Sequence, residues 1–266
     1  MLWRCSEMDG YQIMARDGAI GNVDDMLFDE ARWTVRWVVV DTGHWLSGRR
    51  VLLPPAALGH PDSEQRRFPV DLTRQQVESS PPYESDRPVS RQLESGLYDF
   101  YGWSPYWTAD LMPPLGYLSG GAGFLYMPER GDPVPAESAG DKPGAGSAPP
   151  TEHRDATLFS IGDTTGHGIR ASDGDIGHVE DFLVEEAGWR VRYMVVDTRN
   201  WLAGRKVLIS PQWISAVDWP ERRVHVDLTR HAIETSPEFD PSRLPERDYE
   251  GALHGHYGKP GYWLPH

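Results

Sequence analysis

The chain repeats itself. Shifting the sequence by 156 residues superposes residues 2–107 on residues 158–263 without a gap. Identical short runs recur at this single offset: Asp17-Gly18 with Asp173-Gly174, Val39-Val40-Asp41-Thr42 with Val195-Val196-Asp197-Thr198, Trp45-Leu46 with Trp201-Leu202, Gly48-Arg49 with Gly204-Arg205, Asp71-Leu72-Thr73-Arg74 with Asp227-Leu228-Thr229-Arg230, and Tyr106-Trp107 with Tyr262-Trp263. Chance does not produce such a series, so the sequence predicts two tandem copies of one fold.

The copies are separated by a stretch of different composition. Residues 128–153 are rich in Pro, Gly, Ala and Ser, which is typical of a flexible linker. Before it, residues 108–127 are rich in glycine and aromatic side chains and have no counterpart in the second copy; they either pack over the first copy or bind a partner. We therefore predict a first module over 1–107 and a second over 154–266, with barrel cores at about 8–80 and 157–236.

Each copy has the pattern of a small all-β domain. Tyr11–Arg16, the turn dipeptide Asp17-Gly18 and the apolar run Ile20–Phe28 predict a β-hairpin, and the second copy keeps the same order. Further short strands are predicted at Val51–Leu53 and Phe68–Asp71, and at Val207–Ile209 and Val224–Asp227. So many short strands within one small module predict a barrel.

Two more elements complete the predicted module. Trp33, Val35, Trp37 and Val39 alternate with their neighbours, which predicts a strand with these four side chains on one apolar face. Leu72–Ser79 and Leu228–Thr235 have helical composition, begin near Thr73 and Thr229, and precede Pro81 and Pro237.

These motifs resemble the PRC-barrel family, named for the photosynthetic reaction centre. The resemblance depends on the Asp-Gly-x-Ile-Gly hairpin, the Trp-x-Val-Arg strand ending in Val-Val-Asp-Thr, and the Trp-Leu-x-Gly-Arg segment, and it covers both copies. The chain is similar to stand-alone bacterial proteins of this family, here with two tandem barrels and short helical or irregular tails. The resemblance implies a barrel for protein–protein contact and assembly, and it supplies no catalytic residues.

The segment between two strands of each copy is the candidate partner-binding site. Trp and Arg dominate binding hot spots, and a loop on a rigid frame presents them well. The candidate residues are Trp45, Leu46, Arg49, Trp201, Leu202 and Arg205. The alternative is that the two tryptophans close a barrel end while Arg49 and Arg205 pair with Asp41 and Asp197.

Other features give no catalytic, cofactor or metal site. Asp24-Asp25 with Asp29-Glu30, and Glu180-Asp181 with Glu185-Glu186, lack the spacing of a calcium loop. His254-Gly255-His256 has no third ligand nearby and is replaced by Tyr98-Asp99-Phe100 in the first copy, which favours a structural position. We expect a protein that is not an enzyme and uses no cofactor.

Charge and cysteine content limit the partners. Forty acidic and 26 basic side chains give a formal charge of −14, which disfavours binding to nucleic acid. The single Cys5 forms no internal disulfide, and no apolar run is long enough to span a membrane. We expect a cytoplasmic protein, attached to a membrane complex only through a partner.

The sequence thus predicts a non-enzymatic interaction or assembly scaffold. The two barrels would pair within the chain, or the chain would form a homo-oligomer, and its protein partners are not identified by the sequence. One alternative is an accessory factor of the ribosome or of the photosynthetic apparatus. An enzyme with an unrecognised site is the other alternative.

Overall fold

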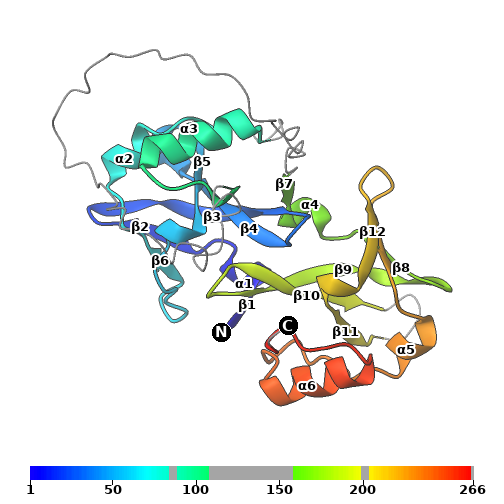
Figure 1. Cartoon of the computed structure of the whole chain (residues 1–266). Helices are drawn as coiled ribbons and strands as arrows, with labels where there is room; N and C mark the ends of the chain where they lie inside the picture. Colours follow the sequence, from blue (N-terminus) through cyan, green and yellow to red (C-terminus); the bar gives the residue numbers. More distant parts are fainter. Residues whose placement is uncertain (84–88, 108–157, 199–203, 265–266) are drawn as a thin grey trace, which may run out of the picture.

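The computed structural model describes residues 1–83, 89–107, 158–198 and 204–264 (Figure 1). The first copy contains β1 (Leu2–Arg4), α1 (Cys5–Met8), β2 (Gln12–Ala15), β3 (Gly18–Asp29), β4 (Thr34–Asp41), η1 (Gly43–Leu46), β5 (Arg50–Leu53), η2 (Pro55–Ala57), β6 (Arg67–Pro69), α2 (Arg74–Glu78) and α3 (Arg91–Tyr101). The predicted hairpin, strands and helix of this copy are therefore confirmed.

The second copy repeats these elements. It contains β7 (Leu158–Ser160), α4 (Ile161–Thr164), β8 (Gly168–Ala171), β9 (Gly174–Glu185), β10 (Arg190–Asp197), β11 (Lys206–Ile209), η5 (Pro211–Trp213), β12 (Ile214–Asp218), β13 (Arg223–Val226), α5 (Arg230–Glu234) and α6 (Arg247–His256). The strand β12 is an addition of this copy, since residues 58–62 of the first copy form only isolated bridges.

Each copy builds a small, mainly antiparallel barrel that includes one parallel pair of strands. In the first copy, β2, β3, β4 and β5 pair in order, and β6 runs parallel to β2. In the second copy, β8, β9, β10 and β11 pair in the same order, and β13 runs parallel to β8. The two sheets join into one sheet of 13 strands, so the fold is two tandem small β-barrels as expected.

A glycine after each hairpin turn lets two strands approach closely. A Cβ atom at Gly21 would lie 2.1 Å from the Asp41 carbonyl oxygen, and one at Gly177 would lie 2.0 Å from that of Asp197. Both distances are far below van der Waals contact. The Ile-Gly pair found at the same place in both copies is therefore explained by the packing of β3 on β4 and of β9 on β10.

The expectation that Trp33, Val35, Trp37 and Val39 share one face is wrong. Val35 packs in the large core with Val38 and Val40, whereas Trp37 and Val39 belong to a separate apolar cluster. A β-bulge explains the switch: Leu27 pairs with Trp37 but the next residue, Phe28, pairs with Val35. The extra residue of a bulge reverses the alternation of the side chains that follow it.

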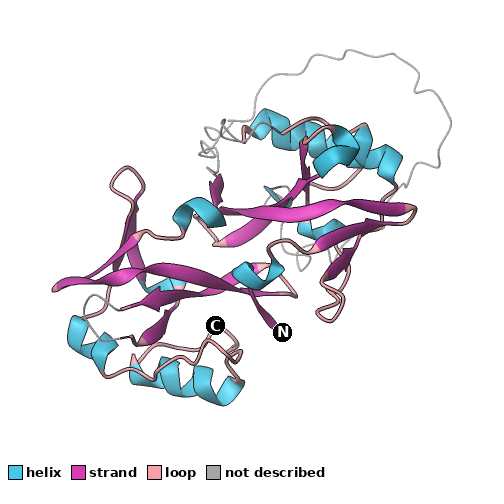
Figure 2. Cartoon of the chain, turned by 180° about the vertical axis from the view of Figure 1, so that it is seen from behind, coloured by secondary structure: helices cyan, strands magenta, loops and turns pink. Residues whose placement is uncertain are grey.

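The helices begin at the threonines that the sequence indicates. Thr73 accepts a hydrogen bond from the Gln76 amide and Thr229 accepts one from the Ala232 amide, each closing the first turn of its helix. The tail helices α3 and α6 lie on opposite outer faces of the molecule, with the strands of both copies between them (Figures 1 and 2).

Some predictions concern parts of the chain outside the described residues. These are the linker over 128–153 and the whole segment 108–127, so the module boundaries stay predictions. Within the described ranges, no helix combines the length and the apolar character needed to cross a membrane.

Candidate functional site: the junction of the two copies

The two copies exchange their first strands. Strand β1 pairs with β9 of the second copy, and β7 pairs with β3 of the first. The registers are equivalent at the 156-residue offset: Trp3 lies opposite Val184, and Phe159 lies opposite Phe28. Each barrel therefore includes a strand supplied by the other copy.

A third strand contact lies at the centre of this arrangement. Thr34 of β4 pairs with Arg190 of β10, which is its own counterpart in the second copy. The Val35 amide donates to the Trp189 carbonyl at 2.8 Å, and the Val191 amide donates to the Trp33 carbonyl at 2.7 Å. A residue facing its own counterpart marks a pseudo-two-fold axis, as in the isologous interface of a homodimer.

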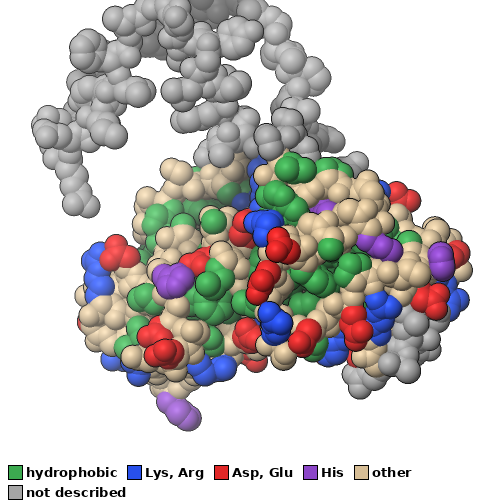
Figure 3. Space-filling view, turned by 90° about the horizontal axis from the view of Figure 1, so that it is seen from below, with side chains coloured by type: hydrophobic (Ala, Val, Ile, Leu, Met, Phe, Trp, Pro, Cys, Tyr) green, Lys and Arg blue, Asp and Glu red, His purple; other side chains and the backbone are tan. Residues whose placement is uncertain are grey.

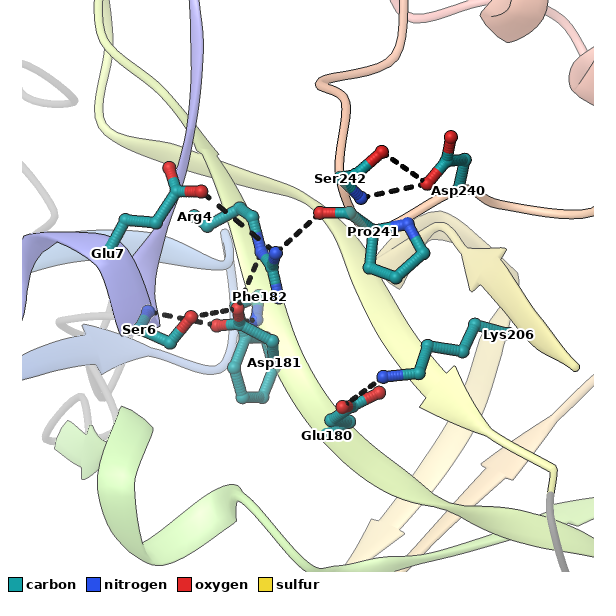
Figure 4. A network of polar contacts seen from close by, with 10 residues as sticks. All are labelled: Arg4, Ser6, Glu7, Glu180, Asp181, Phe182, Lys206, Asp240, Pro241 and Ser242. Atoms are coloured by element: carbon teal, nitrogen blue, oxygen red, sulfur yellow. Dashed lines mark hydrogen bonds and ion pairs between the residues drawn. The ribbon is translucent and has the colours of Figure 1, made fainter. Parts of the chain in front are cut away.

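One aspartate of each copy anchors the segment received from the other copy, and Figure 4 shows the site at the buried Asp181. Asp181 accepts hydrogen bonds from the Ser6 amide at 3.1 Å and from Arg4 Nε at 3.1 Å, and also from the Ser6 hydroxyl. On the other side, Asp25 accepts from the Gly162 amide at 3.0 Å and from the Ser160 hydroxyl. Each aspartate thus holds the turn that follows the strand received from the other copy.

The acidic clusters of the sequence thus have a structural role: Asp25 and Asp181 lie at the junction, whereas Asp24 and Glu180 form ion pairs within their own copies. Burial raises the pKa of Asp25, and the hydrogen bonds from Ser160 and Gly162 oppose this rise. Arg4 also donates to the Pro241 carbonyl at 2.6 Å, which ties the first strand to the tail of the second copy. Among the described residues, no group of three or more His, Cys, Asp or Glu side chains could hold a metal ion.

Aromatic side chains fill the junction. Phe28 of the first copy lies with its ring centre 6.2 Å from both Phe159 and Phe182 of the second. Phe159 stacks on Trp219, whose indole N–H donates to Glu30 at 3.0 Å. At the equivalent place, the Trp3 indole donates to Glu186 at 3.3 Å. One apolar core consequently runs through both barrels.

A cavity of about 200 Å³ lies between the two anchoring sites. Its wall includes Cys5, Asp25, Ile161 and Asp181. Burial raises the pKa of the Cys5 thiol well above its usual value, and the nearby Asp181 and Asp25 carboxylates add to the rise. A thiol held in its protonated form is a poor nucleophile.

The structure gives Arg49 and Arg205 a structural role. Arg49 donates to the carbonyl oxygens of Glu78, at 3.0 Å, and Ser80, at the end of α2. Arg205 donates to the equivalent carbonyls of Glu234 and Ser236. Cations stabilise helix C-termini in this way. The Asp41 carboxylate instead accepts from the Gly43 amide at 2.8 Å.

The rest of the predicted partner-binding segment lies at a barrel end. Trp45 and Leu46 are half-buried in η1, and the Arg74 guanidinium lies 4.5 Å from the centre of the Trp45 ring. The neighbouring His44 and Ser47 are exposed. Trp201 and Leu202 lie outside the described residues, so of the second predicted segment the structure places only Arg205.

Sequence reasoning missed a buried glutamate in each tail. Glu94 accepts from the Trp37 indole at 2.9 Å and from the Tyr106 hydroxyl at 3.3 Å, and it pairs with Arg91. In the second tail, Glu250 accepts from the hydroxyls of Tyr193 and Tyr262 at 3.0 and 2.8 Å, and it pairs with Arg247. The recurrence of Glu94 as Glu250 at the 156-residue offset could have drawn attention to this position. The repeat alone does not show that the two carboxylates are buried.

These networks dock each tail on its own barrel. Burial raises the pKa of Glu94, opposed mainly by the hydrogen bond from Trp37. The Arg36 guanidinium lies 3.9 Å from the centre of the Tyr106 ring, and that of Arg192 lies 4.0 Å from the Tyr262 ring. The charged groups Glu94, Arg36 and Arg192 therefore stabilise the packing of each tail on its barrel.

Comparison with known proteins agrees with this geometry. The family model for the PRC-barrel domain matches residues 3–77 and 163–232, which together are more than half of the chain. No curated protein shows a significant match to the sequence. The two matched regions coincide with the two barrels, and the chain belongs to the PRC-barrel family.

Proposed function

We propose that this chain is a non-enzymatic protein–protein interaction scaffold, in which two PRC barrels act as one rigid unit. The observation that carries the proposal is the reciprocal exchange of β1 and β7, because it fixes the distance and orientation between equivalent surfaces of the two copies. A rigid pair of equivalent surfaces gains affinity for partners through multivalency.

The roles of the buried carboxylates support binding over catalysis. Asp25, Asp181, Glu94 and Glu250 each accept hydrogen bonds that hold a turn or a tail in place. General acid–base catalysis needs such groups at a site where they reach a substrate. In this protein all four connect elements of the fold, including Asp25 and Asp181, which also lie in the wall of the cavity.

The surface suits protein partners. On the face seen from below, hydrophobic side chains reach the surface among acidic and basic ones (Figure 3). A mixed surface of this kind is typical of protein interfaces. With a formal charge of −14, the chain is unsuited to polyanions, and we propose a cytoplasmic location with membrane complexes reached through a partner.

Affinity capture from a lysate of the native source tests the proposal. The baits are the intact chain, a Trp45→Ala/Leu46→Ala variant, and an Arg243→Ala control that alters an exposed side chain far from η1. Each bait is first shown to keep the thermal midpoint of the intact chain. We expect proteins that are retained by the intact chain and the control and lost from the variant of η1.

Two results would contradict the proposal. One is a set of captured proteins identical to that of an unrelated bait of similar negative charge. The other is turnover of a small-molecule substrate by the purified chain, because this would place an active site in the fold. Arg49 is left unchanged in this experiment because it caps α2.

A further inference from the structure

The two copies differ most at one sheet edge. In the second copy, β12 and β13 form an antiparallel hairpin with a bulge between Ile214 and Ala216. The first copy has Pro61 and Pro69 where the second has Val217 and His225, and its chain forms only isolated bridges there. Proline lacks an amide hydrogen and disfavours a continuous strand. Without these prolines, the second copy extends the sheet by one strand.

Strand β12 is the terminal strand at one end of the sheet. It has five residues without proline, and Ser215 and Ala216 are exposed. The terminal strand at the other end, β6, has three residues and includes Pro69. Proteins block exposed edges with short strands and prolines to prevent pairing. The edge at β6 has both devices, and β12 has neither.

A groove runs beside this open edge. It has a volume of about 350 Å³, and Ile214, Ser215, Ala216 and Val217 all line it. A strand that presents a face to a groove contributes every second residue, because its side chains alternate. Here four consecutive residues line the groove, across the bulge between Ile214 and Ala216, so the groove follows most of the length of β12.

The rest of the groove lining is mainly basic. It contains three arginines, Arg32, Arg190 and Arg192, and one acidic side chain, Glu30. Arg192 is paired with Glu185, and Glu30 accepts from the Trp219 indole. Arg190 is exposed and forms no ion pair with any residue of the described ranges. This local excess of positive charge contrasts with the formal charge of −14 of the whole chain.

We propose that this groove binds an acidic, extended segment of a partner protein, which adds to β12 as a further strand. The backbone edge supplies hydrogen bonds that do not depend on the partner's sequence, as in other cases of strand addition. Arg190 selects an acidic side chain on one face of the incoming strand. The inference rests on the proposed interaction function but concerns a different surface from η1.

Amide chemical-shift changes in the full-length chain test the proposal. The probe is a synthetic peptide of alternating glutamate and valine, and the comparison peptide has glutamine in place of glutamate. We expect the acidic peptide to bind with a Kd below about 1 mM. The largest changes should fall on Ser215–Val217 and on Arg190. The glutamine peptide should bind at least about tenfold more weakly.

Charge reversal separates the groove from general electrostatics. Arg190→Glu should weaken binding at least about tenfold, and raising salt should weaken it further. The matched control is Arg67→Glu, which reverses an exposed arginine on the blocked edge strand β6. This variant should bind the peptide as the intact chain does.

Three outcomes would overturn the inference. The first is the absence of shift changes at β12 with millimolar acidic peptide. The second is an equal loss of peptide affinity in Arg190→Glu and Arg67→Glu, which would show that the peptide is attracted by overall charge and has no specific site. The third is concentration-dependent pairing of the chain through β12, because the edge would then serve a second copy. None of these outcomes affects the capture experiment on η1. The proposal for the groove can therefore be refuted while the proposed interaction function still holds.

Discussion

Gly21 and Gly177 have the strictest steric requirement of the residues in the hairpins. We expect Gly21→Ala and Gly177→Ala each to destabilise the chain by about 1–3 kcal/mol or more, because a methyl group would overlap a backbone carbonyl. Chemical denaturation of each variant measures this loss. Gly96→Ala is the control: a Cβ there meets no atom within 4 Å, so a helical alanine should leave stability unchanged or raise it. Equal stability of all three variants would refute the steric explanation.

Arg49 illustrates how a residue chosen from the sequence can be structural. Removing it by Arg49→Ala leaves the Glu78 and Ser80 carbonyls without their charged donor. We expect a loss of about 2 kcal/mol in the free energy of unfolding and faster hydrogen exchange in α2. Arg67→Ala, at an exposed position of β6, should have little effect. A destabilisation no larger than that of the control would contradict the capping role.

His254 makes the second tail sensitive to acid. Burial lowers its pKa, and its ring contacts the Tyr193 hydroxyl and the Pro260 carbonyl. Because the unfolded chain binds the proton more readily, stability should fall as the pH drops below about 6.5. His254→Gln should flatten this dependence in denaturation curves measured between about pH 5 and 7. His231→Gln, at an exposed position, should leave it unchanged.

At the scale of elements, the sequence predicts what is local. The hairpins, the short strands and the helices capped by Thr73 and Thr229 follow from turn dipeptides, alternation and capping residues. The bulge in β4 is not predicted, because the sequence from Trp33 to Val39 alternates as in a regular strand. Nothing in that alternation marks Arg36 as the residue without a partner in β3. The docking of α3 and α6 through Glu94 and Glu250 is also missed, since the sequence marks these glutamates only as charged residues.

The anchoring of α1 by Asp181 gives a test at this scale. Asp181→Ala removes the acceptor of Arg4 and of the Ser6 amide and leaves the Arg4 guanidinium, which is largely buried, without its carboxylate. We expect a loss of about 3 kcal/mol in stability. Hydrogen exchange should increase in β1 and α1, although the substitution lies in β9. Changes confined to β9 would show that the contact between the copies is dispensable.

At the scale of the molecule, the repeat predicts two barrels but cannot assign their strands. The 156-residue offset is the same whether β1 and β7 remain in their own copies or are exchanged. The pairing of β1 with β9 and of β7 with β3 distinguishes the two cases. We therefore expect the two copies to unfold as one cooperative unit in place of two independent modules.

The measurement that tests this account most directly is a disulfide across the axis. Thr34 and Arg190 face each other at a position without mutual backbone hydrogen bonds, where Cα atoms of antiparallel strands are about 4.5 Å apart. That separation permits a disulfide. In a Cys5→Ser background, Thr34→Cys/Arg190→Cys should form an intramolecular disulfide in dilute solution, and Thr34→Cys/Arg223→Cys should not. Intermolecular cross-linking alone, or equal cross-linking of both pairs, would contradict the exchanged, pseudo-two-fold arrangement.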